Sequence, residues 1–171
     1  MNYATIKPWD IANGPGVRVS LFVSGCTHHC KDCFNPEAWD FDYGEPFTEA
    51  VMDHILELLR PDYIRGITYL GGEPFDPHNQ PGLLALTQKI RAAYPEKSIW
   101  SFTGYVYGQN LPQLPGVTDA LLAGLDVLVD GPFIAARKNL GLRFRGSDNQ
   151  RLIDLPKTLK TGAVVLWDET Q

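Results

Sequence analysis

Short apolar runs alternate with amphipathic stretches along this chain, and this alternation restricts the fold more than any other feature. The strand-length apolar runs are residues 19–23, 67–70, 99–102 and 127–129. The stretches with helical spacing of apolar residues are 48–60, 83–94 and 118–123. A repeated strand–helix–strand order implies parallel strands joined by right-handed crossovers. The sequence therefore predicts an α/β fold built on a parallel sheet.

The length of the chain limits the architecture further. Its 171 residues suit one domain, and no repeat or linker divides them, so residues 1–171 are expected to form a single domain. A complete eight-fold barrel needs a longer chain, so about five or six strands predict a partial, open (β/α) barrel. The segment after residue 152 has a weaker pattern, in which residues 163–167 are predicted to form an edge strand.

Composition and charge exclude two classes of protein. The formal net charge is −5, whereas a nucleic-acid-binding domain needs a basic face. Basic residues do gather late in the chain, at Arg137, Lys138, Arg143, Arg145 and Arg151. No apolar run approaches the roughly 18–20 residues that span a bilayer, and residues 1–10 lack the layout of a signal peptide. Neither nucleic acid nor a membrane is expected as a partner, and the cytoplasm is the expected location.

Three cysteines, Cys26, Cys30 and Cys33, follow closely after the apolar run 19–23. The carboxyl ends of parallel strands are where α/β folds bind ligands. Disulfide bonds here would close loops too small to constrain the chain and would leave one thiol over. Three closely spaced thiolates can instead bind three irons of a [4Fe–4S] cluster. Because the chain has no fourth cysteine, the remaining iron would be open to a small molecule.

Two other uses of the cysteines are chemically reasonable. A zinc ion would take the three cysteines together with His28 or His29, but structural zinc sites usually draw their ligands from two separated knuckles. A simple electron carrier would normally need a fourth cysteine for its cluster. The spacing therefore favours the open cluster. His28 and His29 are then expected to be solvated loop residues, or at most to lie behind the ligands.

The spacing Cys-x3-Cys-x2-Cys after a strand resembles the radical S-adenosylmethionine superfamily, in which the methionine amino and carboxylate groups chelate the open iron. The second point of resemblance is the turn Gly71-Gly72-Glu73-Pro74 after the next predicted strand. Alone, this turn would read as an ordinary strand-to-helix connection. Glycines let the backbone approach a ligand closely, and a carboxylate suits an ammonium group. The resemblance implies that Gly71, Gly72 and Glu73 hold the methionine amino group.

The expected adenine contact departs from the superfamily pattern. Many members carry an aromatic residue immediately before the third cysteine, where it stacks on adenine. Here that position is Asp32, and the aromatic follows Cys33 as Phe34. By resemblance, Asp32, Cys33 and Phe34 are expected beside the adenine, with Phe34 as the substitute stacking group. A role for Phe34 in the core or as a lid is an equal alternative.

Further segments resemble the activating enzymes of glycyl radical enzymes, and among these the activases of anaerobic ribonucleoside-triphosphate reductases. The segments are residues 10–18, 24–26, 103–105, 129–133 and 144–150. The resemblance implies that a flavodoxin or ferredoxin reduces the cluster, which cleaves S-adenosyl-L-methionine to a 5′-deoxyadenosyl radical. That radical would remove hydrogen from a glycine of the reductase large subunit. Activases with a ferredoxin-like insert are excluded, because the chain has no cysteines for a second cluster.

Some alternatives stay open at this point. An activase of the pyruvate formate-lyase type would be longer, and the segment 144–150 argues against a small-molecule radical enzyme such as a carboxy-deazaguanine synthase. Residues 13–16 could contact the partner or form only a turn. Asp130 ends a predicted strand, so a role in the site is favoured over a cap, and in related activases an aspartate near here helps to bind a monovalent cation. Arg145 and Asn149 could be structural or could bind the partner.

Overall fold

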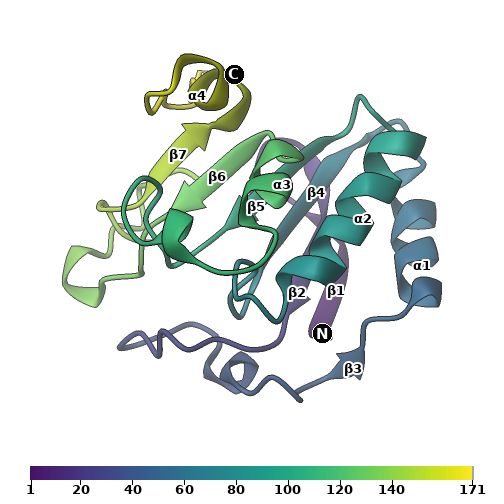
Figure 1. Ribbon diagram of the computed structural model, residues 1–171, viewed down its shortest axis with the longest axis horizontal. Helices are drawn as coiled ribbons and strands as arrows, with labels where there is room; N and C mark the ends of the chain where they lie inside the picture. Colours follow the sequence, from purple (N-terminus) through teal and green to yellow (C-terminus); the bar gives the residue numbers. More distant parts are fainter. Residues whose placement is uncertain (171) are drawn as a thin grey trace.

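The computed structural model describes residues 1–170, in which seven strands form one mixed sheet (Figure 1). The strands are β1 (Asn2–Asp10), β2 (Val17–Val23), β3 (Glu45–Pro46), β4 (Ile64–Gly71), β5 (Ser98–Phe102), β6 (Val127–Asp130) and β7 (Arg151–Asp154). The α-helices are α1 (Glu49–Leu59), α2 (Gln80–Ala93), α3 (Thr118–Ala123) and α4 (Leu155–Thr161). Three short 3-10 helices are Pro36–Trp39, Leu111–Gln113 and Ala135–Arg137. None of the helices in these residues is long and apolar enough to cross a membrane.

The strands lie in the order β3-β1-β2-β4-β5-β6-β7, and the sheet is open, with β3 and β7 at its edges. The four central strands, β2, β4, β5 and β6, are parallel. β1 pairs antiparallel with β2 and β3, and β7 pairs antiparallel with β6. The predicted α/β fold with a parallel sheet is thus confirmed for the centre. As in other parallel sheets, the carboxyl ends of the central strands meet at one edge.

The sheet has seven strands, whereas the sequence predicts about five or six. β1 was not predicted because it contains Pro8 and alternates half-buried with exposed side chains, so it has no apolar run. Proline is tolerated there because β1 lies near the edge of the sheet. Residues 163–167 lie at the predicted edge but form, in the described residues, only a single antiparallel bridge, Ile153 with Leu166, in which the N–H of Asp154 donates to the Val165 carbonyl and the N–H of Trp167 to the Leu152 carbonyl, each over 2.8 Å. β7 is the last full strand of the sheet, and after α4 the chain returns to its outer side.

The main core lies between the sheet and helices α1, α2 and α3, which cover the same face in Figure 1. Alternate residues of β2, namely Val19, Leu21 and Val23, point into this core and are fully buried. Their partners on the helices are apolar residues at helical spacing: Met52, Ile55 and Leu59 on α1, and Leu83, Leu86 and Ile90 on α2. Burial of each large side chain contributes about 1.5–3 kcal/mol. This packing holds the central strands in register.

The opposite face of the sheet is only partly filled. Near the middle of the sheet, a small second core joins Trp100 of β5 to Phe144 and Trp167, whose rings lie 5.5 and 4.9 Å from it. Further along the strands, Phe22 and Phe102 line a cavity rather than a packed core. The cavity opens at the carboxyl ends of the parallel strands. The fold therefore leaves room for a ligand where the sequence predicts one.

Candidate active site

Loops that follow β2, β4, β5 and β6 surround a cavity of about 530 Å³. This volume is in the usual range for small-molecule sites, about 300–1,000 Å³. Of the residues predicted from the sequence, those that line the cavity are Cys26, Cys30, Cys33, Phe34, Gly71, Gly72 and Glu73. Two motifs about 40 residues apart in the chain therefore face one space.

The cysteine loop and the glycine turn touch through their backbones. The N–H of Glu73 donates to the carbonyl of Gly25 over 2.7 Å. The N–H of Gly72 donates to the carbonyl of Val23, also over 2.7 Å. A Cβ on Gly72 would lie 2.5 Å from the Gly25 oxygen and 2.9 Å from the Ala38 oxygen. Glycine is needed at position 72 because the two loops approach this closely.

Two of the cysteines, Cys26 and Cys30, are thiols of raised pKa. Burial raises the pKa of Cys26 to about 11, and the charge of Glu73 acts in the same direction. The backbone N–H groups of His28 and His29 donate to the Cys26 sulfur and oppose this shift. Burial also raises the pKa of Cys30. Because the thiolate is the metal ligand, metal binding at these positions releases protons.

The chemistry of the loop fits an iron–sulfur cluster better than a single ion. All three cysteines are free and partly buried, and all line the cavity. Within residues 1–170, no three His, Cys, Asp or Glu side chains converge closely enough to hold one metal ion, as a zinc site requires. Thiols spread along one loop suit the separate corners of a larger cluster. Trp39 also lines the cavity, and within residues 1–170 its buried indole N–H has no hydrogen-bond partner.

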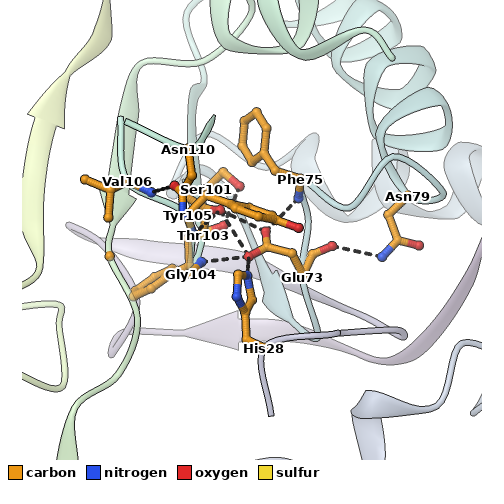
Figure 2. Close-up of polar contacts among 12 residues, drawn as sticks. His28, Glu73, Phe75, Asn79, Ser101, Thr103, Gly104, Tyr105, Val106 and Asn110 are labelled. Atoms are coloured by element: carbon orange, nitrogen blue, oxygen red, sulfur yellow. Dashed lines mark hydrogen bonds and ion pairs between the residues drawn. The ribbon is translucent and has the colours of Figure 1, made fainter. Parts of the chain in front are cut away.

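Glu73 is fully buried, and its carboxylate is the centre of a hydrogen-bond network (Figure 2). Oε1 accepts from the N–H of Gly104 over 2.7 Å, and Oε2 accepts from the N–H of Phe75 over 2.8 Å. The Thr103 hydroxyl lies 2.9 Å from Oε2 and 3.1 Å from Oε1. His28 Nε2 lies 2.8 Å from Oε1. A carboxylate offers about four acceptor sites, so donors of the protein occupy most of them.

The two histidines of the cysteine loop have different environments. His28 is only 18% exposed, and its ring meets the Tyr105 ring edge-on at a centroid distance of 4.5 Å. The hydrogen bond to Glu73 raises the pKa of His28, against the effect of burial. His29 is exposed and stacks on Trp39, with ring centroids 4.4 Å apart. Solvation of His28 was therefore a wrong expectation, while a position behind the cysteines agrees with the structure.

Phe34 and Asp32, on either side of Cys33 in the sequence, differ in whether they line the cavity. Phe34 lines the cavity and packs on Phe133, with ring centroids 4.9 Å apart. Lys138 Nζ lies 5.5 Å from the centroid of the Phe34 ring. The ring is 69% exposed, so a role in the core is wrong and the ring is accessible to a ligand. Asp32 is exposed, has a φ of +58° and is not among the residues that line the cavity.

The loop between β1 and β2 reaches the cavity through Ala12 and Asn13. The Asp10 carboxylate accepts from the Ala12 N–H over 2.8 Å and from Asn13 Nδ2 over 2.6 Å. It also accepts from the Ser20 hydroxyl over 2.6 Å. Burial acts to raise the pKa of Asp10, but the three hydrogen bonds together lower it. The predicted turn is thus a fixed part of the cavity wall.

Arg18 holds the same loop from the interior of the sheet and is fully buried. Its Nε donates to the Thr68 hydroxyl over 3.0 Å, and Nη2 donates to the carbonyls of Ile67 and Ser98 over 2.8 and 3.0 Å. Nη1 donates to the Ser98 hydroxyl over 2.8 Å and to the Pro15 carbonyl over 3.4 Å. None of these acceptors is a carboxylate, and burial lowers the pKa of Arg18.

Asp130 lies at the carboxyl end of β6 and is buried. Its Oδ1 accepts from Arg151 Nε over 3.0 Å. Its Oδ2 accepts from the Tyr107 N–H over 2.8 Å and from Arg151 Nη2. Both oxygens are therefore bound to groups of the protein, and the pair joins β6 to β7. This arrangement favours a structural role for Asp130 over binding of a cation.

The other basic residues late in the chain contact acidic or aromatic side chains. These contacts are Arg137 with Asp148, Arg145 with Glu169, Lys138 with the Phe34 ring and Arg143 with the Phe144 ring. Asn149 donates to the Pro132 carbonyl over 2.8 Å. The group is thus part of the folded loop after β6, which closes one side of the cavity.

Thr103 and Gly104 belong to the site although no role was predicted for them. They directly follow β5, and both line the cavity and bind Glu73. The rule that pointed to the cysteines, that ligands bind at the carboxyl ends of parallel strands, applies to them equally. The sequence also placed His28 in the cysteine loop, but its bond to Glu73 could not be predicted, because the two residues are 45 positions apart in the chain.

Similarity to known proteins agrees with this geometry. The family model of a 4Fe-4S single cluster domain matches residues 12–153. The chain is 44% identical over 152 residues to an anaerobic ribonucleoside-triphosphate reductase-activating protein of Escherichia coli strain K12, covering 88% of this chain and 96% of that protein. The Vibrio cholerae protein of that name is 43% identical, again over 88% of this chain and 96% of that protein. That of Enterobacteria phage T4 is 41% identical, over 89% of this chain and 93% of the phage protein.

Proposed function

Because the chain belongs to the family of anaerobic ribonucleoside-triphosphate reductase-activating proteins, we propose that the cavity at the carboxyl ends of β2, β4 and β5 is where it generates the radical that activates such a reductase. The observation that carries this assignment is that three free cysteines and the turn 71–74 face one cavity. The protein is an activating enzyme with a 4Fe-4S domain.

We propose that Cys26, Cys30 and Cys33 hold the [4Fe–4S] cluster. When bound, the cluster supplies the electron that splits S-adenosyl-L-methionine into methionine and a 5′-deoxyadenosyl radical, which takes a hydrogen atom from a glycine of the reductase large subunit. With only three cysteines in the chain, one iron is left for the cosubstrate. The loop provides the ligands, and the loops after β4, β5 and β6 surround them.

The other predicted residues have proposed roles in binding the cosubstrate. We propose that Gly71, Gly72 and Glu73 hold the methionine amino group at the end of β4, where the two glycines, which lack a Cβ, permit close approach. Glu73 is held in one orientation by its bonds to Thr103 and the N–H of Gly104. Phe34, with its exposed ring, is the proposed contact for adenine. Asp32 and Cys33 are its neighbours in the loop.

Three broader features belong to the same proposal. The open sheet, with α1, α2 and α3 on one face and a cavity on the other, is interpreted as the incomplete (β/α) barrel of radical S-adenosylmethionine enzymes. A flavodoxin or ferredoxin is proposed as the electron donor. The cytoplasm is the proposed location, because reduced thiols persist in that compartment.

Anaerobic reconstitution with iron and sulfide, followed by reduction with S-adenosyl-L-methionine present, tests this function. The wild-type protein should form 5′-deoxyadenosine, and Cys26→Ala, Cys30→Ala and Cys33→Ala should each abolish it while the folded chain remains. With the reductase added, a glycyl radical should appear in the EPR spectrum. A colourless protein that binds one zinc ion and forms no deoxyadenosine would reject the proposal.

A further inference from the structure

His28 connects the cysteine loop to the ends of two other strands. It lies between Cys26 and Cys30, and in Figure 2 its ring points from that loop toward Glu73, beside Gly104. Its Nε2 is 2.8 Å from Glu73 Oε1, and the same oxygen accepts from the N–H of Gly104 over 2.7 Å. One carboxylate oxygen thus binds the loop after β2 to the loop after β5.

The ring of His28 is also confined by its neighbours. A Cβ added to Gly104 would lie 2.7 Å from both Cδ2 and Nε2 of the ring, so glycine at this position makes room for it. The Tyr105 ring meets it edge-on at 4.5 Å. At the other end of the same residue, the backbone N–H of His28 donates to the Cys26 sulfur. His28 therefore contacts a cysteine and Glu73 at once.

The loop itself has little structure of its own to keep this shape. Residues 27–34 contain no helix or strand, and two of them, His29 and Asp32, have positive φ values. Backbone bonds join the loop to its surroundings at its base, where the N–H of Cys26 donates to the Trp39 carbonyl over 3.2 Å. The bond from His28 to the buried Glu73 is a side-chain anchor between the first two cysteines of the loop.

We propose that His28 is a positioning residue: it fixes the cysteine loop against Glu73 and so sets the position of the cysteines relative to the turn 71–74 before any metal binds. This inference rests on the proposed function for its consequence, because the distance from cluster to cosubstrate depends on that relative position. His28 itself is not a ligand in this proposal.

Hydrogen–deuterium exchange of the metal-free protein tests the anchor directly. In His28→Ala, amides of residues 27–33 should exchange about tenfold faster than in the wild type, the factor for losing about 1.4 kcal/mol of a charge-assisted hydrogen bond. His28→Gln should restore slow exchange, because its amide nitrogen can reach Glu73 as Nε2 does. His54→Gln is the matched control, since His54 is exposed on α1.

Gly104→Ala tests the same contact from the other side. Its Cβ should displace the His28 ring and speed hydrogen exchange in the loop to a similar degree. The double variant with His28→Ala and Gly104→Ala should exchange at almost the same rate as His28→Ala alone. After cluster loading, the EPR change on adding S-adenosyl-L-methionine should be altered in His28→Ala and restored in His28→Gln.

Loop exchange in His28→Ala that equals the wild type would overturn the proposal, as would independent, additive effects of the two substitutions. If His28→Ala does not fold, exchange in His28→Gln and Gly104→Ala decides in its place. Since these measurements use the metal-free protein, they do not depend on radical chemistry. Absence of deoxyadenosine in the wild type would reject the proposed function and leave the anchor standing.

Discussion

Replacing Gly72 with alanine tests whether the turn after β4 and the cysteine loop must touch. The added Cβ would lie 2.5 Å from the carbonyl oxygen of Gly25 and 2.9 Å from that of Ala38. Both are backbone atoms, which cannot rotate away as a side chain can. Ordinary contacts of a Cβ begin at 3.4 Å, so the turn and the loop must separate by about 0.9 Å.

The expected cost of this separation is that of inserting a methyl group into a packed site, about 1–3 kcal/mol. For a chain of this size each kcal/mol lowers the melting temperature by about 2–4 °C, so the metal-free Gly72→Ala protein should melt about 2–12 °C below the wild type. The same shift weakens the bond of 2.7 Å from the Glu73 N–H to the Gly25 carbonyl. Deoxyadenosine formation by the reconstituted variant should therefore be slower than in the wild type even at temperatures where the variant is fully folded.

Gly82→Ala is the matched control, because it is the same chemical change in helix α2. The three atoms nearest to its Cβ would all belong to the flexible side chain of Met1, the first at 3.2 Å. Alanine favours a helix over glycine by up to about 1 kcal/mol, so this variant should melt at or slightly above the wild type and keep full activity. If Gly72→Ala also melts with the wild type and forms deoxyadenosine at the wild-type rate, the close approach of the two loops is not required and the reasoning is refuted.

Three further substitutions test the supports of the site. Arg18→Met leaves the buried Ile67 carbonyl and the partly buried Ser98 carbonyl without their Arg18 donors, so urea unfolding should show a loss of about 1–3 kcal/mol in the free energy of unfolding; an unchanged free energy of unfolding would contradict the network. Asp10 has a lowered pKa, so its ionised form stabilises the fold above the unfolded pKa of about 3.9, and this contribution disappears as the pH falls through the lower folded pKa. The stability difference between wild type and Asp10→Asn should thus be constant from about pH 5 to 8 and shrink below about pH 4, whereas a difference that persists at about pH 2 would count against it. Asp130→Asn should speed hydrogen exchange in β7 and cost about 1–3 kcal/mol, because its partner Arg151 is 35% exposed and partly solvated; unchanged exchange there would mean that the pair does not hold β7.

The central architecture could be predicted because its signals are local. The apolar run in β2 and the helical spacing in α1 each depend on residues within one element, and both are found where expected. β1 could not be predicted, because its half-buried and exposed residues form no apolar run and the strand is defined by its pairing with β2. The extent of pairing at residues 163–167 has the same origin, since a short apolar segment does not reveal that it meets Arg151–Asp154 in only one bridge within residues 1–170.

The site divides in the same way. The sequence by itself determined the chemistry: three thiols at close spacing after one strand, and two glycines with a carboxylate after another. The tertiary structure alone decided the contacts, because the parallel sheet brings together His28, Glu73 and Gly104, which are 45 and 31 residues apart. Residue types and spacings are properties of a local segment, whereas the burial of Glu73 and the choice of its donors depend on how three separate loops pack at one edge of the sheet.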